Sequence, residues 1–143
     1  MGSPKWVGQC GPDDCSIAAV ACALGIKYEE ADAAIGGISR EIQATRNDAD
    51  TSLRAILCDD YELHLKMLAM EHGKRVILVI DNPQTPTPGS VYIASIKSDY
   101  VTGKHAVVVD RDGLVIDPNN KRLRVHWSKV EILRLLYQFT DES

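Results

Sequence analysis

The chain is poor in aromatic residues and in long apolar runs, and both shortages limit what kind of protein it can be. Aromatic residues make up 6% of its 143 residues, with a single Phe. Its longest run of large apolar residues, Val76–Ile80, is far shorter than the roughly 20 residues that a membrane-spanning helix needs. The first residues also lack the charged and apolar pattern of a secretory leader. We therefore expect no membrane span and a cytoplasmic location.

An excess of positive charge is absent as well. The chain has 16 lysine and arginine residues against 20 aspartate and glutamate residues, a formal net charge of -4 at pH 7. Proteins that bind nucleic acid draw most of their affinity from cationic side chains that neutralise phosphates. The one small basic cluster, Lys121, Arg122 and Arg124, is typical of a solvated strand face. We expect no nucleic-acid partner.

The length suits one domain. A chain of this size can bury a hydrophobic core of its own without disulfide or metal staples, and no internal repeat or low-complexity segment divides it. We expect a single domain over residues 1–143, with flexible ends at 1–5 and 140–143. The sequence does not indicate an oligomeric state.

Four cysteines in a chain without a secretory leader are expected to be thiols. Cys10 and Cys15 have four residues between them, a spacing that zinc sites use, but no second cysteine pair follows. His64 and His72 would have to complete such a site, and they lie eight residues apart. We therefore expect no structural zinc among these residues and no metal or organic cofactor.

The first half of the chain has helical periodicity. A buried helix is predicted over Ser16–Leu24, with Gly25 as its C-cap and small residues on its second face that let another layer approach closely. A short helix is predicted over Tyr28–Ile35, and one or two helices over Asp50–His72. The apolar residues of the first helix recur at Ile17, Val20, Ala21 and Leu24.

The second half has the pattern of strands. The run Arg75–Ile80 is typical of a strand buried on both faces, and Ser90–Ile96 alternates sufficiently to be a strand. His105–Arg111 and Leu114–Asp117 are predicted to form a hairpin, and Val125–Phe139 fits either a helix or a final strand. The order of elements predicts an α+β fold, in which N-terminal helices pack on a C-terminal antiparallel sheet.

Cys15 is the candidate nucleophile. It falls at the first turn of the predicted central helix, where free backbone N–H groups and the positive end of the helix dipole stabilise an anion. A thiol in that position has a lowered pKa, and its thiolate is nucleophilic. The other interpretation is a small residue that packs at the start of a helix.

His105 and Asp117 are the candidate base and its orienting acceptor. A cysteine nucleophile needs a base within hydrogen-bonding distance, and the base needs an acceptor to hold it. A two-residue turn at Asp112 and Gly113 would place the two side chains on opposite faces of the hairpin. A three-residue turn that also includes Arg111 would place them on one face as diagonal neighbours. The catalytic interpretation requires the second register or an equivalent bulge.

Gln9 lies six residues before Cys15. A side-chain amide beside the start of a helix can donate to an oxyanion while a backbone N–H donates from the other side. Taken alone, Gln9 would be read as a solvated loop residue. The order of Gln9, Cys15, His105 and Asp117 is what gives it significance.

Two blocks of the sequence, one around Cys15 and one from His105 to Asp117, resemble the papain-like cysteine peptidases. QCGPDDCSIAAVACALGI and GKHAVVVDRDGLVIDPN are similar above all to the double-glycine leader peptidase domains of bacteriocin exporters and their stand-alone relatives. The resemblance implies a papain-like fold in which Cys15 is the nucleophile, His105 the general base, Asp117 the residue that orients it and Gln9 the oxyanion donor. Ser16 departs from the Gly that usually follows the nucleophile in that family.

The function expected from this resemblance is a thiol hydrolase that cleaves a peptide or isopeptide bond in a peptide or protein substrate, without a cofactor. Two alternatives stay open. Arylamine acetyltransferases and transglutaminase-like proteins place Cys, His and Asp in the same order, so the triad is also compatible with acyl transfer. A non-catalytic module could use a papain-like cleft to bind a peptide.

Overall fold

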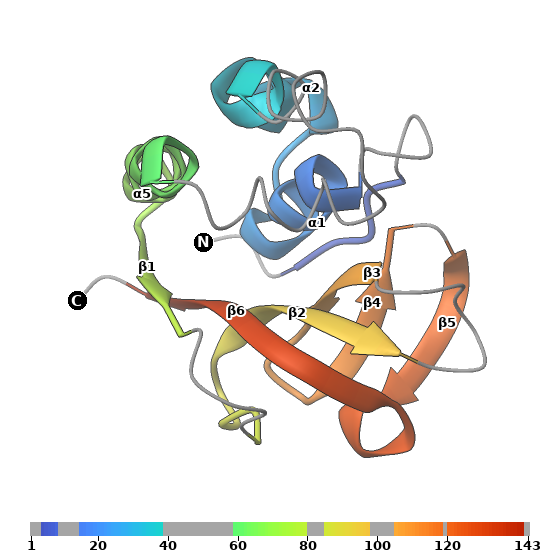
Figure 1. The fold of residues 1–143 in the computed structure, drawn as a ribbon. Helices are drawn as coiled ribbons and strands as arrows, with labels where there is room; N and C mark the ends of the chain where they lie inside the picture. The colour runs from blue at the N-terminus through green and yellow to red at the C-terminus, as the bar shows by residue number, and fades with distance from the viewer. Residues whose placement is uncertain are drawn as a thin grey trace.

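Helices and an antiparallel sheet form two layers in the computed structural model (Figure 1), which describes residues 4–8, 15–38, 59–79, 85–97, 105–118 and 120–141. Within these residues, six strands form one open sheet. The predicted mixture of helices followed by an antiparallel sheet is confirmed. In spatial order the strands are β1 (Lys74–Leu78), β6 (Glu131–Asp141), β2 (Val91–Lys97), β3 (His105–Val109), β4 (Leu114–Asp117) and β5 (Asn120–His126).

The central helix α1 (Cys15–Leu24) ends as its sequence predicts. Gly25 takes a φ of +68°, which a residue with a Cβ adopts only at a cost. The Gly25 N–H donates to the Cys22 carbonyl over 3.2 Å, and the Ile26 N–H donates to the Ala21 carbonyl over 3.0 Å. This paired C-cap satisfies two carbonyls that the helix end would leave free.

Two further helical regions lie in the same layer (Figure 1). The helix α2 (Tyr28–Ala31) continues into a π-helical turn, η1 (Asp32–Gly36), and together they match the predicted short helix. The longest described helix, α5 (Asp59–Glu71), ends before Gly73, which has a φ of +69°. The expected helical residues before position 59 lie outside the described part of the chain. No helix in that part is long and apolar enough to cross a membrane.

The expected burial of the first strand on both faces is wrong. β1 lies at the edge of the sheet, where Arg75 is exposed and Ile77 is 44% exposed, so the strand is not covered on both faces. β2 lies between β6 and β3 and has six consecutive buried residues. A continuous apolar run is compatible with either place, because long-range pairing decides which strand is central.

The ambiguous segment Val125–Phe139 forms strand and not helix. β5 ends at His126, the 3₁₀ turn η2 (Trp127–Lys129) follows, and β6 runs from Glu131 between β1 and β2. β6 shifts its register twice against β2; at the first shift Ile93 pairs with Tyr137 and Ala94 with Leu135. Leu136 is therefore an extra residue in β6, which explains why three consecutive side chains are buried there.

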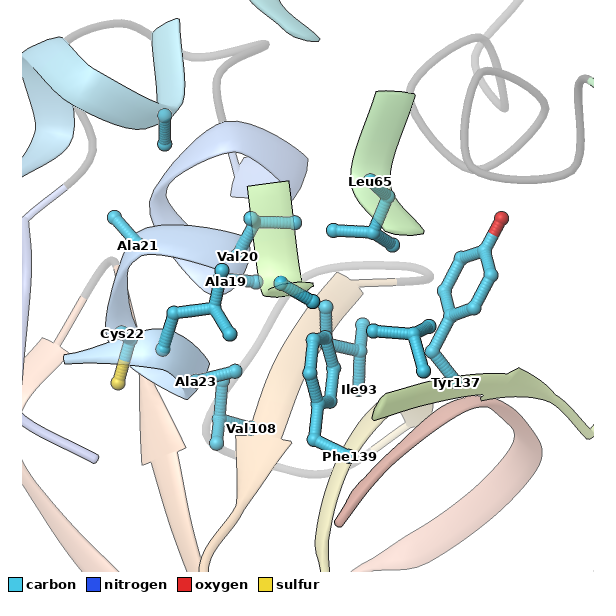
Figure 2. Close-up of a cluster of buried hydrophobic side chains, with 14 of the residues drawn as sticks. Ala19, Val20, Ala21, Cys22, Ala23, Leu65, Ile93, Val108, Tyr137 and Phe139 are labelled. Carbon is cyan, nitrogen blue, oxygen red and sulfur yellow. The ribbon is translucent and has the colours of Figure 1, made fainter. Parts of the chain in front are cut away.

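Two apolar clusters lie on opposite faces of the sheet. The first, which we call the helix-side cluster, joins α1 and α5 to the sheet. In Figure 2, Val20 and Ala23 of α1 face Val108 and Ile93, while Leu65 of α5 lies near Tyr137. The second, the sheet-side cluster, consists of Tyr92, Ala94, Ile96, Val107, Val109, Val115 and Leu135.

Residues near both ends of the chain are tied to the fold. The Lys5 N–H donates to the Cys22 carbonyl over 3.2 Å. At the other end Thr140 pairs with Arg75 and Asp141 pairs with Lys74. The expectation of flexible ends at 1–5 and 140–143 therefore does not hold for Lys5, Thr140 and Asp141.

Candidate functional site

The backbone places Cys15 where the nucleophile was expected, at the first residue of α1. The first N–H groups of a helix have no partner within it, so this end carries a partial positive charge that favours a thiolate. Gln9 and the side chains of Cys15 and His105 lie outside the described part of the chain. The geometry of the candidate site therefore comes from the elements that carry these residues and from Asp117.

The β3–β4 hairpin has the three-residue turn that the catalytic interpretation requires. Val109 pairs with Val115 and Val108 with Ile116, and the Asp110 N–H donates to the Leu114 carbonyl over 2.9 Å. Residues 111–113 are left as the turn. The alternative of a two-residue turn is excluded.

Two residues hold the hairpin in this register. The Asp110 carboxylate accepts hydrogen bonds of 2.9 Å from the backbone N–H groups of Asp112 and Leu114. Gly113 has a φ of +84°, and a Cβ at this position would lie 2.8 Å from Nε2 of His126. The turn therefore needs both an acceptor at Asp110 and the absence of a side chain at Gly113.

The register brings the expected base and its acceptor to one end of the sheet. His105 begins β3 as the Cα partner of Ile96, and Asp117 is the last residue of β4. The described β3–β4 pairs end at Val108 and Ile116, and the β4–β5 register shifts between Val115 and Asp117. With a three-residue turn, regular alternation along both strands gives positions 105 and 117 the same parity. Figure 1 shows the start of β3 and the end of β4 at the same end of the sheet.

Positions 105 and 117 do not have the parity of the strand residues that face α1. Val107 and Val115 have the parity of positions 105 and 117, and both lie in the sheet-side cluster. Val108 and Ile116, of the other parity, lie in the helix-side cluster with α1. By this parity, positions 105 and 117 belong to the sheet face opposite α1, and no contact among the described residues joins them to Cys15.

Asp117 is buried and adjoins the N-terminal segment. It is 1% exposed, and its backbone carbonyl accepts a hydrogen bond of 2.9 Å from Nε1 of Trp6. Because Lys5 is bonded to Cys22 of α1, residues 4–8 connect α1 to the end of β4. Trp6 lies three residues before Gln9 in the sequence. The hydrogen bond from Trp6 to Asp117 was not predicted from the sequence. The only indication of it was the general rule that a tryptophan N–H needs a hydrogen-bond acceptor when the ring is partly buried.

Cys22 has the environment of an unreactive cysteine, as expected. It is a free, fully buried thiol. Burial raises the pKa of Cys22 to about 12, against a smaller opposing effect of a hydrogen bond with the Val7 backbone. A thiol with this pKa forms almost no thiolate at neutral pH. Cys10 and Cys58 lie outside the described residues.

The other histidines make local contacts away from this end of the sheet. Nδ1 of His64 lies 2.8 Å from the Asp60 carbonyl oxygen, one turn earlier in α5. Nδ1 of His126 lies 2.8 Å from Oγ of Ser128 and accepts from its backbone N–H, which caps η2. His72 contacts Glu30. The contacts of His64 and His126 are exposed and join neighbouring residues of the same segment.

Comparisons of the chain with protein-family models, with curated proteins and with solved structures find no match.

Proposed function

We propose that the protein is a single-domain, papain-like thiol hydrolase that cleaves a peptide or isopeptide bond. Cys15 is the nucleophile, His105 the general base, Asp117 the acceptor that orients the imidazole, and Gln9 a donor to the oxyanion. The observation that carries the proposal is the register of the β3–β4 hairpin. Of the two possible turns, the hairpin has the three-residue turn. With this turn, regular alternation gives positions 105 and 117 a common parity.

The chemistry follows from these roles. His105 takes the proton of the Cys15 thiol, and the sulfur attacks the carbonyl carbon of the scissile bond. The Gln9 amide and the Cys15 backbone N–H stabilise the oxyanion. His105 then gives its proton to the leaving amine, which departs and leaves a thioester on Cys15. A water molecule, deprotonated by His105, attacks the thioester and releases the acid together with the Cys15 thiol.

The proposal predicts one cysteine that is alkylated much faster than the others. The rate at which a limiting amount of iodoacetamide modifies each thiol should be measured by peptide mass analysis between pH 5 and 9. Cys15 is expected to react at pH 6, at least about tenfold faster than an ordinary thiol of pKa near 8.5. The His105→Ala variant should lose most of this advantage, because the thiolate loses its imidazolium partner.

Cys22→Ala is the matched control, since Cys22 lies on the same helix and its thiol pKa is raised to about 12. It should leave the labelling of Cys15 unchanged. Equal labelling of all four cysteines at pH 6, or a Cys15 rate that is the same with and without His105, would contradict the proposed triad. Product masses with and without an added amine then separate hydrolysis from acyl transfer.

A further inference from the structure

A second cluster of chemically active side chains lies away from the proposed triad. It consists of Glu30 on α2, Glu71 at the end of α5 and His72 directly after it. One carboxylate oxygen of each glutamate and one imidazole nitrogen of His72 all lie within 4.8 Å of one another. Nε2 of His72 is 2.5 Å from Oε2 of Glu30.

Ordered backbone on both sides fixes the positions from which these three side chains extend. After the last turn of α5, the His72 N–H donates to the Ala69 carbonyl over 3.0 Å, and the Gly73 N–H donates to the Met70 carbonyl over 3.1 Å. On the other side, the Glu30 N–H donates to the Lys27 carbonyl over 3.1 Å at the start of α2. The three donors therefore come from two fixed helix ends, which lowers the entropy cost of bringing them together.

The charges of the cluster distinguish it from a simple ion pair. The contact between His72 and Glu30 accounts for one of the two carboxylates. Glu71 brings a second carboxylate oxygen within 4.8 Å of the Glu30 oxygen and of an imidazole nitrogen, a distance at which the two carboxylates repel each other. A divalent cation would neutralise both carboxylates and would leave the imidazole neutral, which is the form that binds metals.

We propose that Glu30, Glu71 and His72 bind a divalent transition-metal ion, of which zinc is the representative, and that the ion joins α2 to α5. Imidazole together with carboxylate favours zinc and its neighbours, whereas magnesium and calcium prefer all-oxygen sites. This site is separate from the Cys15 chemistry and does not depend on it.

The geometry needs only small movements to reach a metal-bound form. With bonds of about 2.0–2.2 Å, tetrahedral zinc ligands lie roughly 3.3 Å apart. His72 and Glu30 have to separate slightly, and the carboxylate of Glu71 has to move closer. All three side chains can adjust, because both glutamates are exposed and His72 is half-buried. Glu30 and His72 also line an open groove with Trp6 and Tyr28, so a water molecule can take the fourth position.

A zinc titration followed by NMR of the imidazole ring protons tests the proposal one histidine at a time. The Cys15→Ala chain is used, so that the proposed thiolate does not compete for the ion. The ring signals of His72 should shift to saturation at one equivalent of zinc, while those of His64 and His126 serve as internal controls. Glu71→Gln and Glu30→Gln should each weaken binding at least about tenfold. Unchanged control signals show that both variants are folded.

Two results would overturn the site. One is a His72 signal that shifts no more than that of His64 over the same titration. The other is a Glu71→Gln chain that binds zinc as tightly as its parent, which would leave only the ion pair between His72 and Glu30.

Discussion

Gly113 decides the register on which the proposed triad depends. Its φ of +84° closes the three-residue turn, and His126 occupies the space that a side chain would need. The sequence contains an Asp-Gly pair that fits a two-residue turn equally well. The deciding interaction is the Asp110 carboxylate, which accepts from two backbone N–H groups inside the turn.

Gly113→Ala should therefore destabilise the fold and disturb the candidate site together. A residue with a Cβ at this φ costs about 1–2 kcal/mol, and the contact with His126 adds to that cost. Urea unfolding should show a lower midpoint, and the alkylation rate of Cys15 should fall in the variant under native conditions.

Gly37→Ala is the matched comparison. Gly37 has a helical φ of -61°, and a Cβ there would meet nothing within 4 Å. This variant should be as stable as the parent or more stable by up to about 1 kcal/mol. If both glycine variants lost the same stability, the turn would not be under the conformational constraint described above.

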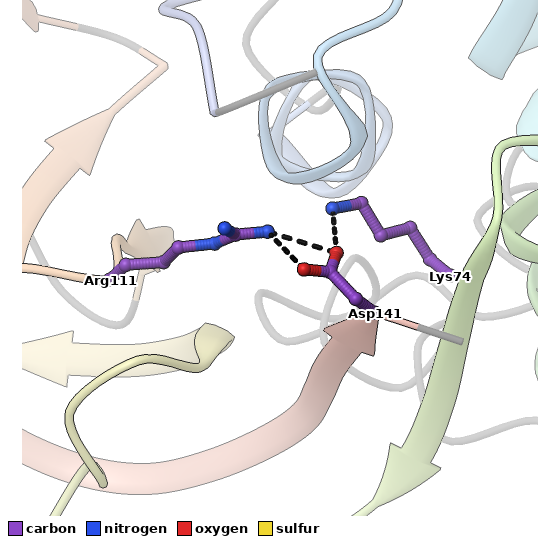
Figure 3. Close-up of polar contacts among 3 residues, drawn as sticks. All are labelled: Lys74, Arg111 and Asp141. Atoms are coloured by element: carbon purple, nitrogen blue, oxygen red, sulfur yellow. Dashed lines mark hydrogen bonds and ion pairs between the residues drawn. The ribbon is translucent and has the colours of Figure 1, made fainter. Parts of the chain in front are cut away.

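At the scale of elements, one carboxylate connects three parts of the sheet. Asp141, near the end of β6, accepts from Nζ of Lys74 on β1 and from the Arg111 guanidinium in the β3–β4 turn (Figure 3). Lys74 is only 4% exposed, so its ammonium group depends on this partner. The hydrogen bond from Lys74, with the positive charges of Lys74 and Arg111, holds the pKa of Asp141 below its ordinary value of 3.8.

Asp141→Asn should lower the melting temperature by roughly 2–6 °C at pH 7, because a buried ammonium group loses its counter-charge. A carboxyl group with a lowered pKa stabilises the folded state above its unfolded pKa near 3.8, and this stabilisation is lost as the pH falls through the folded value. The melting temperature of the parent should therefore converge with that of the variant as the pH falls through the folded pKa of Asp141, which lies below 3.8. Thermal melts followed by circular dichroism between pH 2 and 7 measure both effects.

The exposed turn residue Asp112 provides the control. Asp112→Asn should change the melting temperature at pH 7 by no more than about 1–2 °C. A gap between the parent and Asp141→Asn that persisted unchanged at pH 2 would show that the carboxylate charge is not what stabilises the end of β6.

Helices and strands that are defined by their local sequence could be predicted, but the order of the strands in the sheet could not. α1 follows from its apolar period and from Gly25, and the hairpin follows from Asp112, Gly113 and the strands beside them, whereas the choice between its two registers could not be predicted. The edge position of β1 depends on its pairing with β6, a strand more than fifty residues later. The sequence of β6 fits both the helical and the strand repeat of apolar residues, because the extra residue Leu136 puts three apolar side chains in a row.

In the candidate site, too, local features could be predicted and contacts between distant parts of the chain could not. Cys15 at a helix start and Asp117 at a strand end could be predicted from local patterns, and both positions agree with the structure. The bond from Trp6 to Asp117 could not, because it joins residues 111 positions apart. The cluster of Glu30, Glu71 and His72 was missed for a similar reason, since α2 and α5 meet only in the folded chain.

For the whole molecule, the question is whether the two apolar clusters fold as one unit, as the proposed single domain requires. Leu135 and Leu136 test this, because they are neighbours in β6 and are 1% and 2% exposed. Leu135 lies in the sheet-side cluster and Leu136 in the helix-side cluster. Replacement of either residue therefore weakens one cluster at nearly the same place in the chain.

Leu135→Ala and Leu136→Ala should each cost about 2–5 kcal/mol of unfolding free energy. If the clusters unfold together, both variants should give a single urea transition with the slope of the parent and a lower midpoint. Tryptophan fluorescence and far-ultraviolet circular dichroism should report the same midpoint. A second transition in only one of the variants would divide the chain into two cooperative units.

The bond between Trp6 and Asp117 also gives the protein an internal optical probe. The chain has two tryptophans, and the other, Trp127, packs against the sheet-side cluster beside His126. In a Trp127→Phe chain, all indole emission would come from a ring whose N–H is held at the end of β4. A peptide that occupied that end of the sheet would then change the emission without any attached label.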